Sequence, residues 1–176
     1  MFGMRLALLA VVAVFTLGAE SNPVMLLPLE EFLEDWAISK KFTIEVAEKM
    51  PAEHYDFKPT PEQMTFGQQM VHIAGTLMFR FAQLSGEKMK YDRFPDKVDK
   101  ETAIRLLNEG FDYTLEKVRA MTAPQSEKMF GVKWRGRPEA SGRQMIRGMF
   151  VHTAHHRGQA EMYMRLKGIK PPEYTF

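Results

Sequence analysis

The residues that could carry chemistry in this sequence are its histidines, and two of them are four positions apart. His152 and His156 belong to a row of residues that recurs every three or four positions along the C-terminal segment. The row consists of Met145, Met149, His152, His156, Gln159, Tyr163 and Leu166. In a helix this row forms one face, so both imidazoles project to the same side. Histidines at this spacing can chelate one metal ion, but two ligands alone form a weak site.

His72 is the candidate for the third ligand, because it lies in the middle of the most apolar of the predicted helices. A single histidine in such a place is also typical of a core histidine held by hydrogen bonds. Three buried imidazoles without a ligand, however, would leave several ring nitrogens in need of partners. The sequence therefore predicts that His72, His152 and His156 bind one divalent metal ion. Zinc, nickel, iron and manganese all remain open as its identity.

Other polar residues near these histidines have less defined roles. Gln159 lies in the same row, so it could orient a ligand or a substrate, or simply fill the space between helices. His155 is offset from His152 by about 60° around the helix and could support a ligand or lie at an interface. Arg157 is predicted to form a surface salt bridge, with binding of an anionic substrate as the alternative. His54 is predicted to be structural or solvated.

Several other chemistries are excluded by what the sequence lacks. Thr153 occupies the glutamate position of a His-Glu-x-x-His motif, which removes the usual general base of a zinc peptidase. The chain has no cysteine, so disulfides, thiolate ligands and cysteine nucleophiles are excluded. The net charge is +2 and both signs are interspersed, so there is no basic patch for nucleic acid. We therefore expect a small-molecule substrate and no nucleic-acid partner.

Four helices are predicted to position these residues in an all-α four-helix bundle. They are predicted over Glu30–Met50, from Thr65 to Gly86, from Asp99 to just before Pro124, and over Ser141–Lys167. The first helix has an apolar stripe of Leu29, Leu33, Trp36, Ile44 and Ala47. Thr65 and Ser141 each begin a capping box, with a glutamine three residues later. Residues 125–140 are predicted to form a long loop, in which Met129–Trp134 could make a short extended piece.

Residues 1–19 are predicted to be a signal peptide. Arg5 precedes the apolar run Leu6–Leu17, and the small residues Gly18 and Ala19 follow it. The run has about a dozen residues, whereas a membrane-spanning helix needs about 20. We expect a cleaved signal, an exported protein of the periplasm or the extracellular space, and no stable membrane span after cleavage. An uncleaved anchor is the alternative.

The C-terminal histidines lie in a stretch that resembles a known family. Residues 152–159 read His-Thr-Ala-His-His-Arg-Gly-Gln and resemble the signature of the DinB/YfiT-like family. The resemblance extends to Thr65–Gly75, where the family places its helix-two histidine, and to the linker Met50–Pro61. It covers about residues 30–172, so we place the bundle domain at residues 28–172.

The resemblance implies both a fold and a function. It implies up-down-down-up topology and a divalent ion held by three histidines, which fall here on His72, His152 and His156. Characterised relatives include thiol S-transferases and thiol-dependent isomerases, and dimers are common among them. We therefore expect a metal-dependent enzyme of transferase or hydrolase type, possible as a homodimer. The thiol cosubstrates are cytosolic, whereas this chain is predicted to be exported, so a non-catalytic metal-binding or ligand-binding bundle of the cell envelope is the alternative.

Overall fold

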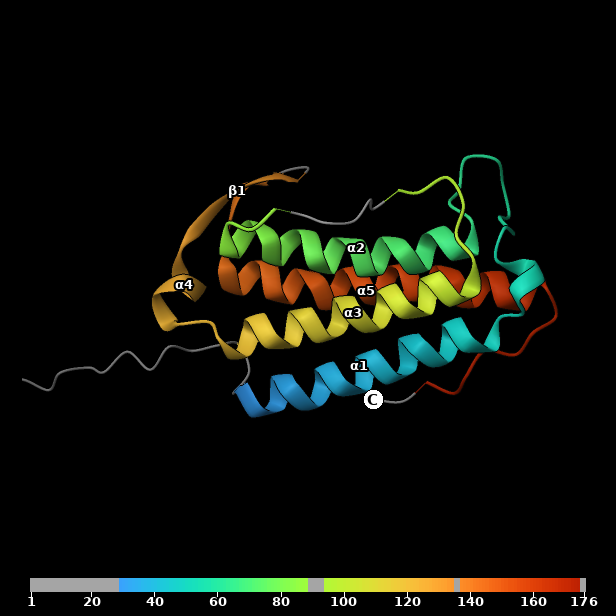
Figure 1. The fold of residues 1–176 in the computed structure, drawn as a ribbon, viewed down its shortest axis with the longest axis horizontal. Coiled ribbons are helices and arrows are strands. Elements are labelled where there is room, and N and C mark those ends of the chain that lie inside the picture. The colour runs from blue at the N-terminus through green and yellow to red at the C-terminus, as the bar shows by residue number, and fades with distance from the viewer. Residues whose placement is uncertain (1–28, 89–93, 135–136, 175–176) are drawn as a thin grey trace, which may run out of the picture.

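Four long helices form the body of the protein. The structure is a computed structural model, and it describes residues 29–88, 94–134 and 137–174. The long helices are α1 (Leu29–Lys49), α2 (Phe66–Ser85), α3 (Lys100–Arg119) and α5 (Gly142–Leu166). In Figure 1, α1 and α5 run in one direction along the bundle and α2 and α3 run in the other. This is the predicted up-down-down-up arrangement.

The helix ends lie where the local sequence signals place them. The hydroxyl of Thr65 accepts a hydrogen bond from the backbone of Gln68, whose side chain bonds back to Thr65, and Ser141 and Gln144 form the same capping box on α5. Asp99 caps α3 by accepting from the backbone of Thr102. These pairs satisfy backbone amides that a helix cannot satisfy internally. The capping boxes predicted from the sequence are confirmed.

The segment between α3 and α5 has more regular structure than the predicted loop, and the extended piece predicted at Met129–Trp134 is confirmed as a strand. It contains the short helix α4 (Ala123–Glu127) and the antiparallel strands β1 (Met129–Trp134) and β2 (Arg137–Ser141). A third capping box, Thr122 with Gln125, starts α4, and Pro124 lies in its first turn, where its missing amide costs nothing. The strands gain stability from a small apolar cluster of Val132, Ala140 and Met145. The fold is therefore mostly helical with a two-stranded sheet.

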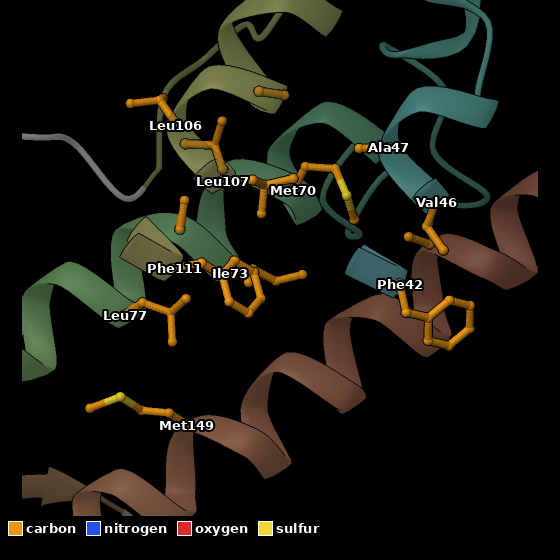
Figure 2. Packing of buried hydrophobic residues seen from close by; sticks show 14 of the residues in the cluster. Phe42, Val46, Ala47, Met70, Ile73, Leu77, Leu106, Leu107, Phe111 and Met149 are labelled. Atoms are coloured by element: carbon orange, nitrogen blue, oxygen red, sulfur yellow. The ribbon is translucent and has the colours of Figure 1, made fainter. Parts of the chain in front are cut away.

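The core lies between all four long helices, and Figure 2 shows part of it. Helices α1 and α2 each pack against both α3 and α5, and the contact of α2 with these two helices is the more extensive. The buried face of α1 differs in part from the predicted stripe, since Leu33 and Ile44 are only partly buried. Its fully buried apolar residues are Phe32, Trp36, Phe42, Val46 and Ala47.

The predicted signal peptide, residues 1–19, lies outside the described residues. Among the helices of the described ranges, none is both long enough and apolar enough to cross a lipid bilayer.

Candidate metal centre

Packing of α2 against α5 brings together the three predicted histidines. His72 lies in the first half of α2, and His152 and His156 lie one turn apart on α5. His72 and His156 are buried, with 8% and 7% of their surfaces exposed, and His152 is half-buried. The three rings face one another, with centroids 4.4 to 4.9 Å apart. One ring nitrogen from each histidine lies within 4.8 Å of the other two.

These distances suit a metal ion. The Nε2 atoms of His72 and His152 are 3.2 Å apart. Two imidazole nitrogens on one tetrahedral zinc ion are separated by about 3.3 Å, given zinc–nitrogen bonds of about 2.0–2.1 Å. The pair therefore has the spacing of two ligands, and a ring nitrogen of His156 lies within 4.8 Å of both. In the described ranges, no carboxylate belongs to the cluster.

The environment keeps the imidazoles of His152 and His156 neutral, which is the form that binds metal. Burial is the main cause that lowers the pKa of His152 to about 2, and the neighbouring His156 and His72 lower it further. Burial likewise lowers the pKa of His156 to about 3, with smaller effects from His72 and His155. Arg80, two turns after His72 on α2, adds positive charge that also lowers the pKa of His152.

A glutamine that the sequence analysis missed holds one of these rings. The Oε1 atom of Gln69 lies 2.6 Å from Nδ1 of His156, and Gln69 is 1% exposed. Its Nε2 atom donates to Oε1 of Gln159 at 2.9 Å and to the hydroxyl of Tyr163 at 3.2 Å. Gln69 precedes His72 by three residues and so shares its helix face, which is the one sequence signal that could have identified it.

The two supporting residues suggested by the sequence are connected to this glutamine. Gln159 is half-buried and its Nε2 atom lies 2.7 Å from Nε2 of His155. His155 is exposed, and its ring centroid is 4.9 Å from that of His156. Both residues therefore lie beside the cluster, and Gln159 reaches it through Gln69.

An aromatic side chain from the α2–α3 connection lies on the cluster. The ring of Phe94 is 4.9 Å from the ring of His72, at an interplanar angle of 32°. Phe94 is nevertheless 57% exposed, so it presents an apolar surface to solvent next to the histidines. No local pattern in the sequence marks this residue, because its position depends on the path of the connection.

Two predictions about α5 are wrong. Arg157 does not lie on the surface and forms no salt bridge with a residue of the described ranges, because it is 4% exposed and faces α1. Its guanidinium lies 4.4 Å from the ring of Phe42 and donates to Ser39 and Thr43 over 3.3 to 3.4 Å. Leu166, the last residue of the predicted inward row, is 60% exposed because the row ends beyond the neighbouring helices.

His54 takes no part in the metal cluster. It is half-buried in a single turn of 3₁₀-helix, Ala52–His54, between α1 and α2. The structure therefore separates it from His72, His152 and His156, in agreement with its predicted structural or solvated role.

A four-helix bundle with converging imidazoles from two facing helices is the general form of a metal-binding bundle protein. The sequence model of the DinB superfamily matches residues 40–160, which is more than half of the chain. The chain therefore belongs to the DinB superfamily. A search of curated proteins gave no match.

Solved structures agree with this fold. The chain is similar to a DinB-like protein from Bacillus cereus ATCC 10987, with a TM-score of 0.68, 20% identity, and coverage of 83% of this chain and 97% of that one. It is also similar to a DinB-like protein from Bacillus subtilis, with a TM-score of 0.64, 19% identity, and coverage of 83% and 96%. A conserved protein from Enterococcus faecalis aligns with a TM-score of 0.57, 14% identity, and coverage of 78% and 95%.

Proposed function

We propose that this protein is an exported enzyme that uses one divalent metal ion, held by His72, His152 and His156, to act on a small molecule. The observation that carries the proposal is the convergence of three ring nitrogens within 4.8 Å of one another. The depressed pKa values of His152 and His156 support it, since the ligands are then ready for a metal at neutral pH. Zinc, nickel, iron and manganese are all compatible with three imidazole ligands.

The donor set supports a reactive role for the ion. Three neutral ligands leave the charge of a divalent ion uncompensated, and in the described ranges no carboxylate is placed to occupy a fourth position. A structural site is usually closed by four protein ligands, whereas a catalytic site keeps a position open. When bound, such an ion supplies Lewis acidity to an oxygen or sulfur atom of a substrate.

The surroundings of the cluster indicate the kind of small molecule. Phe94 offers an apolar surface beside His72, and Arg80 adds positive charge near His152. An organic anion with an apolar part suits both features. By resemblance to the characterised members of the family, transfer to or from a low-molecular-weight thiol is the first reaction to test, and ester hydrolysis is the second.

A second candidate function rests on what the cluster lacks. In the described part of the chain, no aspartate or glutamate joins the three histidines, so no carboxylate is placed among them as a general base. A bundle of the cell envelope that binds a metal or a small ligand without turnover would need no such base. This is the alternative to the enzyme.

Purification followed by turnover assays separates the two functions. The protein is purified without added metal and its metal content is measured by elemental analysis. The metal-loaded protein is then incubated with small thiols and esters, with the metal-free protein as the control. Turnover that requires the metal supports the enzyme, whereas bound metal without turnover of any substrate supports the binding protein. Absence of any bound divalent ion, even after loading, contradicts both the enzyme and the metal-binding protein, and leaves binding of a small ligand as the remaining function.

A further inference from the structure

The hydrogen bonds around Gln69 form a chain whose direction can be determined. A glutamine side chain has one oxygen that accepts and one nitrogen that donates twice. The Nε2 atom of Gln69 faces two oxygens, Oε1 of Gln159 and the hydroxyl of Tyr163, so it is correctly placed as the donor. Its Oε1 atom then faces Nδ1 of His156 and accepts a hydrogen bond from it.

The last hydrogen bond of this series, between Gln159 and His155, is consistent with this direction. Because Oε1 of Gln159 accepts from Gln69, the Nε2 atom of Gln159 faces His155 and donates to it. If the amide of Gln69 were reversed, its Oε1 atom would face Oε1 of Gln159, and both atoms are acceptors. The amide of Gln159 would then have to be reversed as well, and His155 would have to donate to it. With the two amides as the structure places them, every group of this network has a partner and the proton of His156 is on Nδ1.

This assignment decides which nitrogen of His156 can bind an ion. A neutral imidazole has one protonated nitrogen and one lone pair, and the hydrogen bond made by one nitrogen sets the state of the other. With Nδ1 donating to Gln69, the lone pair of His156 is on Nε2. Hydrogen bonds of this kind orient ligands and raise their basicity, and their loss typically costs 10–100-fold in metal affinity.

We propose that Gln69 is a positioning residue, which fixes His156 as the Nδ1-protonated tautomer and so presents Nε2 as a metal ligand. The role goes beyond the three ligands, because Gln69 acts through its hydrogen bond to His156. Its effect on affinity rests on the proposed metal function, whereas its effect on the tautomer does not.

Two variants of Gln69 test the proposal by zinc affinity, measured by competition with a chelator. Gln69→Leu removes the acceptor, and we expect zinc affinity to fall by about 10–100-fold. Gln69→Glu keeps an oxygen opposite Nδ1 of His156, and we expect affinity at least equal to that of the wild type. Gln83→Leu is the matched control, since Gln83 is exposed on the same helix, and it should leave affinity unchanged. Unchanged affinity in Gln69→Leu would overturn the proposal.

A second measurement needs no metal. Long-range ¹H–¹⁵N correlation spectra of the metal-free protein at pH 8 report which nitrogen of His156 is protonated. We expect Nδ1–H in the wild type and in Gln69→Glu, and a shift toward Nε2–H in Gln69→Leu. A wild-type His156 protonated on Nε2 would refute the assignment, even if Gln69→Leu failed to fold. A wild type that binds none of zinc, nickel, iron and manganese but shows the Nδ1–H tautomer would contradict the metal function and still support the positioning role.

Discussion

At the scale of single residues, burial lowers the pKa values of His152, His156 and Arg157, but only the arginine stays charged at neutral pH. His152 and His156 lose their protons more readily because burial lowers their pKa values to about 2 and 3. Arg157 is buried as well, but the hydroxyls of Ser39 and Thr43 and the ring of Phe42 surround its guanidinium. The same helix therefore carries a neutral cluster toward α2 and a cation held against α1.

Removing one imidazole should remove the metal. We expect His152→Ala and His156→Ala each to lower the metal content from about one ion per chain to near zero, because two remaining nitrogens form a weak site. The measurement is elemental analysis after dialysis against metal-free buffer. His54→Ala is the matched control and should keep the ion, since His54 lies outside the cluster. Equal metal content in all three variants would contradict the assignment.

Sequence reasoning could identify the three histidines because their positions follow local rules. Spacing of four on a helix fixes the pair on α5, and the apolar surroundings of His72 indicate its burial. Gln69 and Phe94 could not be identified in this way. The role of Gln69 depends on how α2 packs against α5, and that of Phe94 depends on the path of a connection.

At the scale of the elements, a close contact between α2 and α3 sets the width of the bundle. A Cβ atom added at Gly110 of α3 would lie 3.0 Å from the backbone oxygen of Ala74 and 3.1 Å from its Cα atom. Backbone atoms cannot move aside as a flexible side chain can. The glycine at position 110 therefore allows the two helices to approach each other, and α2 carries His72.

Two glycine-to-alanine changes should have opposite effects on stability. In Gly158 of α5 an added Cβ meets no atom of the described residues within 4 Å, so Gly158→Ala should stabilise the protein by about 1 kcal/mol through helix propensity. In Gly110→Ala the same gain is opposed by overpacking of about 1–3 kcal/mol, so we expect a net loss. Urea unfolding of the metal-free proteins measures both. Equal stabilisation by the two changes would show that α2 and α3 do not approach closely.

The sequence indicates the helix ends more reliably than the element between α3 and α5. Capping boxes are local, and each involves residues three apart, as at Thr65 and Ser141. The pairing of β1 with β2 depends instead on contacts with Met145 of α5, which no local pattern contains. For the same reason Phe32 and Phe42 were missed on α1, because the register of its buried face is set by its neighbours.

At the scale of the whole molecule, export and assembly stay predictions. We expect N-terminal sequencing of the mature protein from its native host to begin near Glu20, because Gly18 and Ala19 form a small-residue cleavage site. An intracellular product that retains Met1 would contradict export. The homodimer expected from the family resemblance can be tested by sedimentation of the same mature product.

Acid should destabilise the metal-free protein, and the buried imidazoles determine the direction. In the folded state the pKa values of His152 and His156 are lowered to about 2 and 3, whereas in the unfolded chain a histidine titrates near 6.5. Between pH 7 and pH 5 the unfolded chain therefore binds protons that the folded chain does not bind. The free energy of unfolding must then fall as the pH falls, because the unfolded state has the greater proton uptake.

The expected loss is about 2 kcal/mol per histidine between pH 8 and pH 5, since one pKa unit corresponds to about 1.4 kcal/mol. Urea unfolding at pH 8, 7, 6 and 5 in the presence of a chelator measures it. The double variant His152→Ala/His156→Ala should lose most of this dependence, while His54→Ala should keep it, because His54 is not in the buried cluster. A wild type whose stability is constant from pH 8 to pH 5 would mean that its imidazoles accept protons in the folded state. In that case water would reach the cluster and its imidazoles would be charged at pH 5. Protons would then compete directly with a metal ion for the same nitrogens.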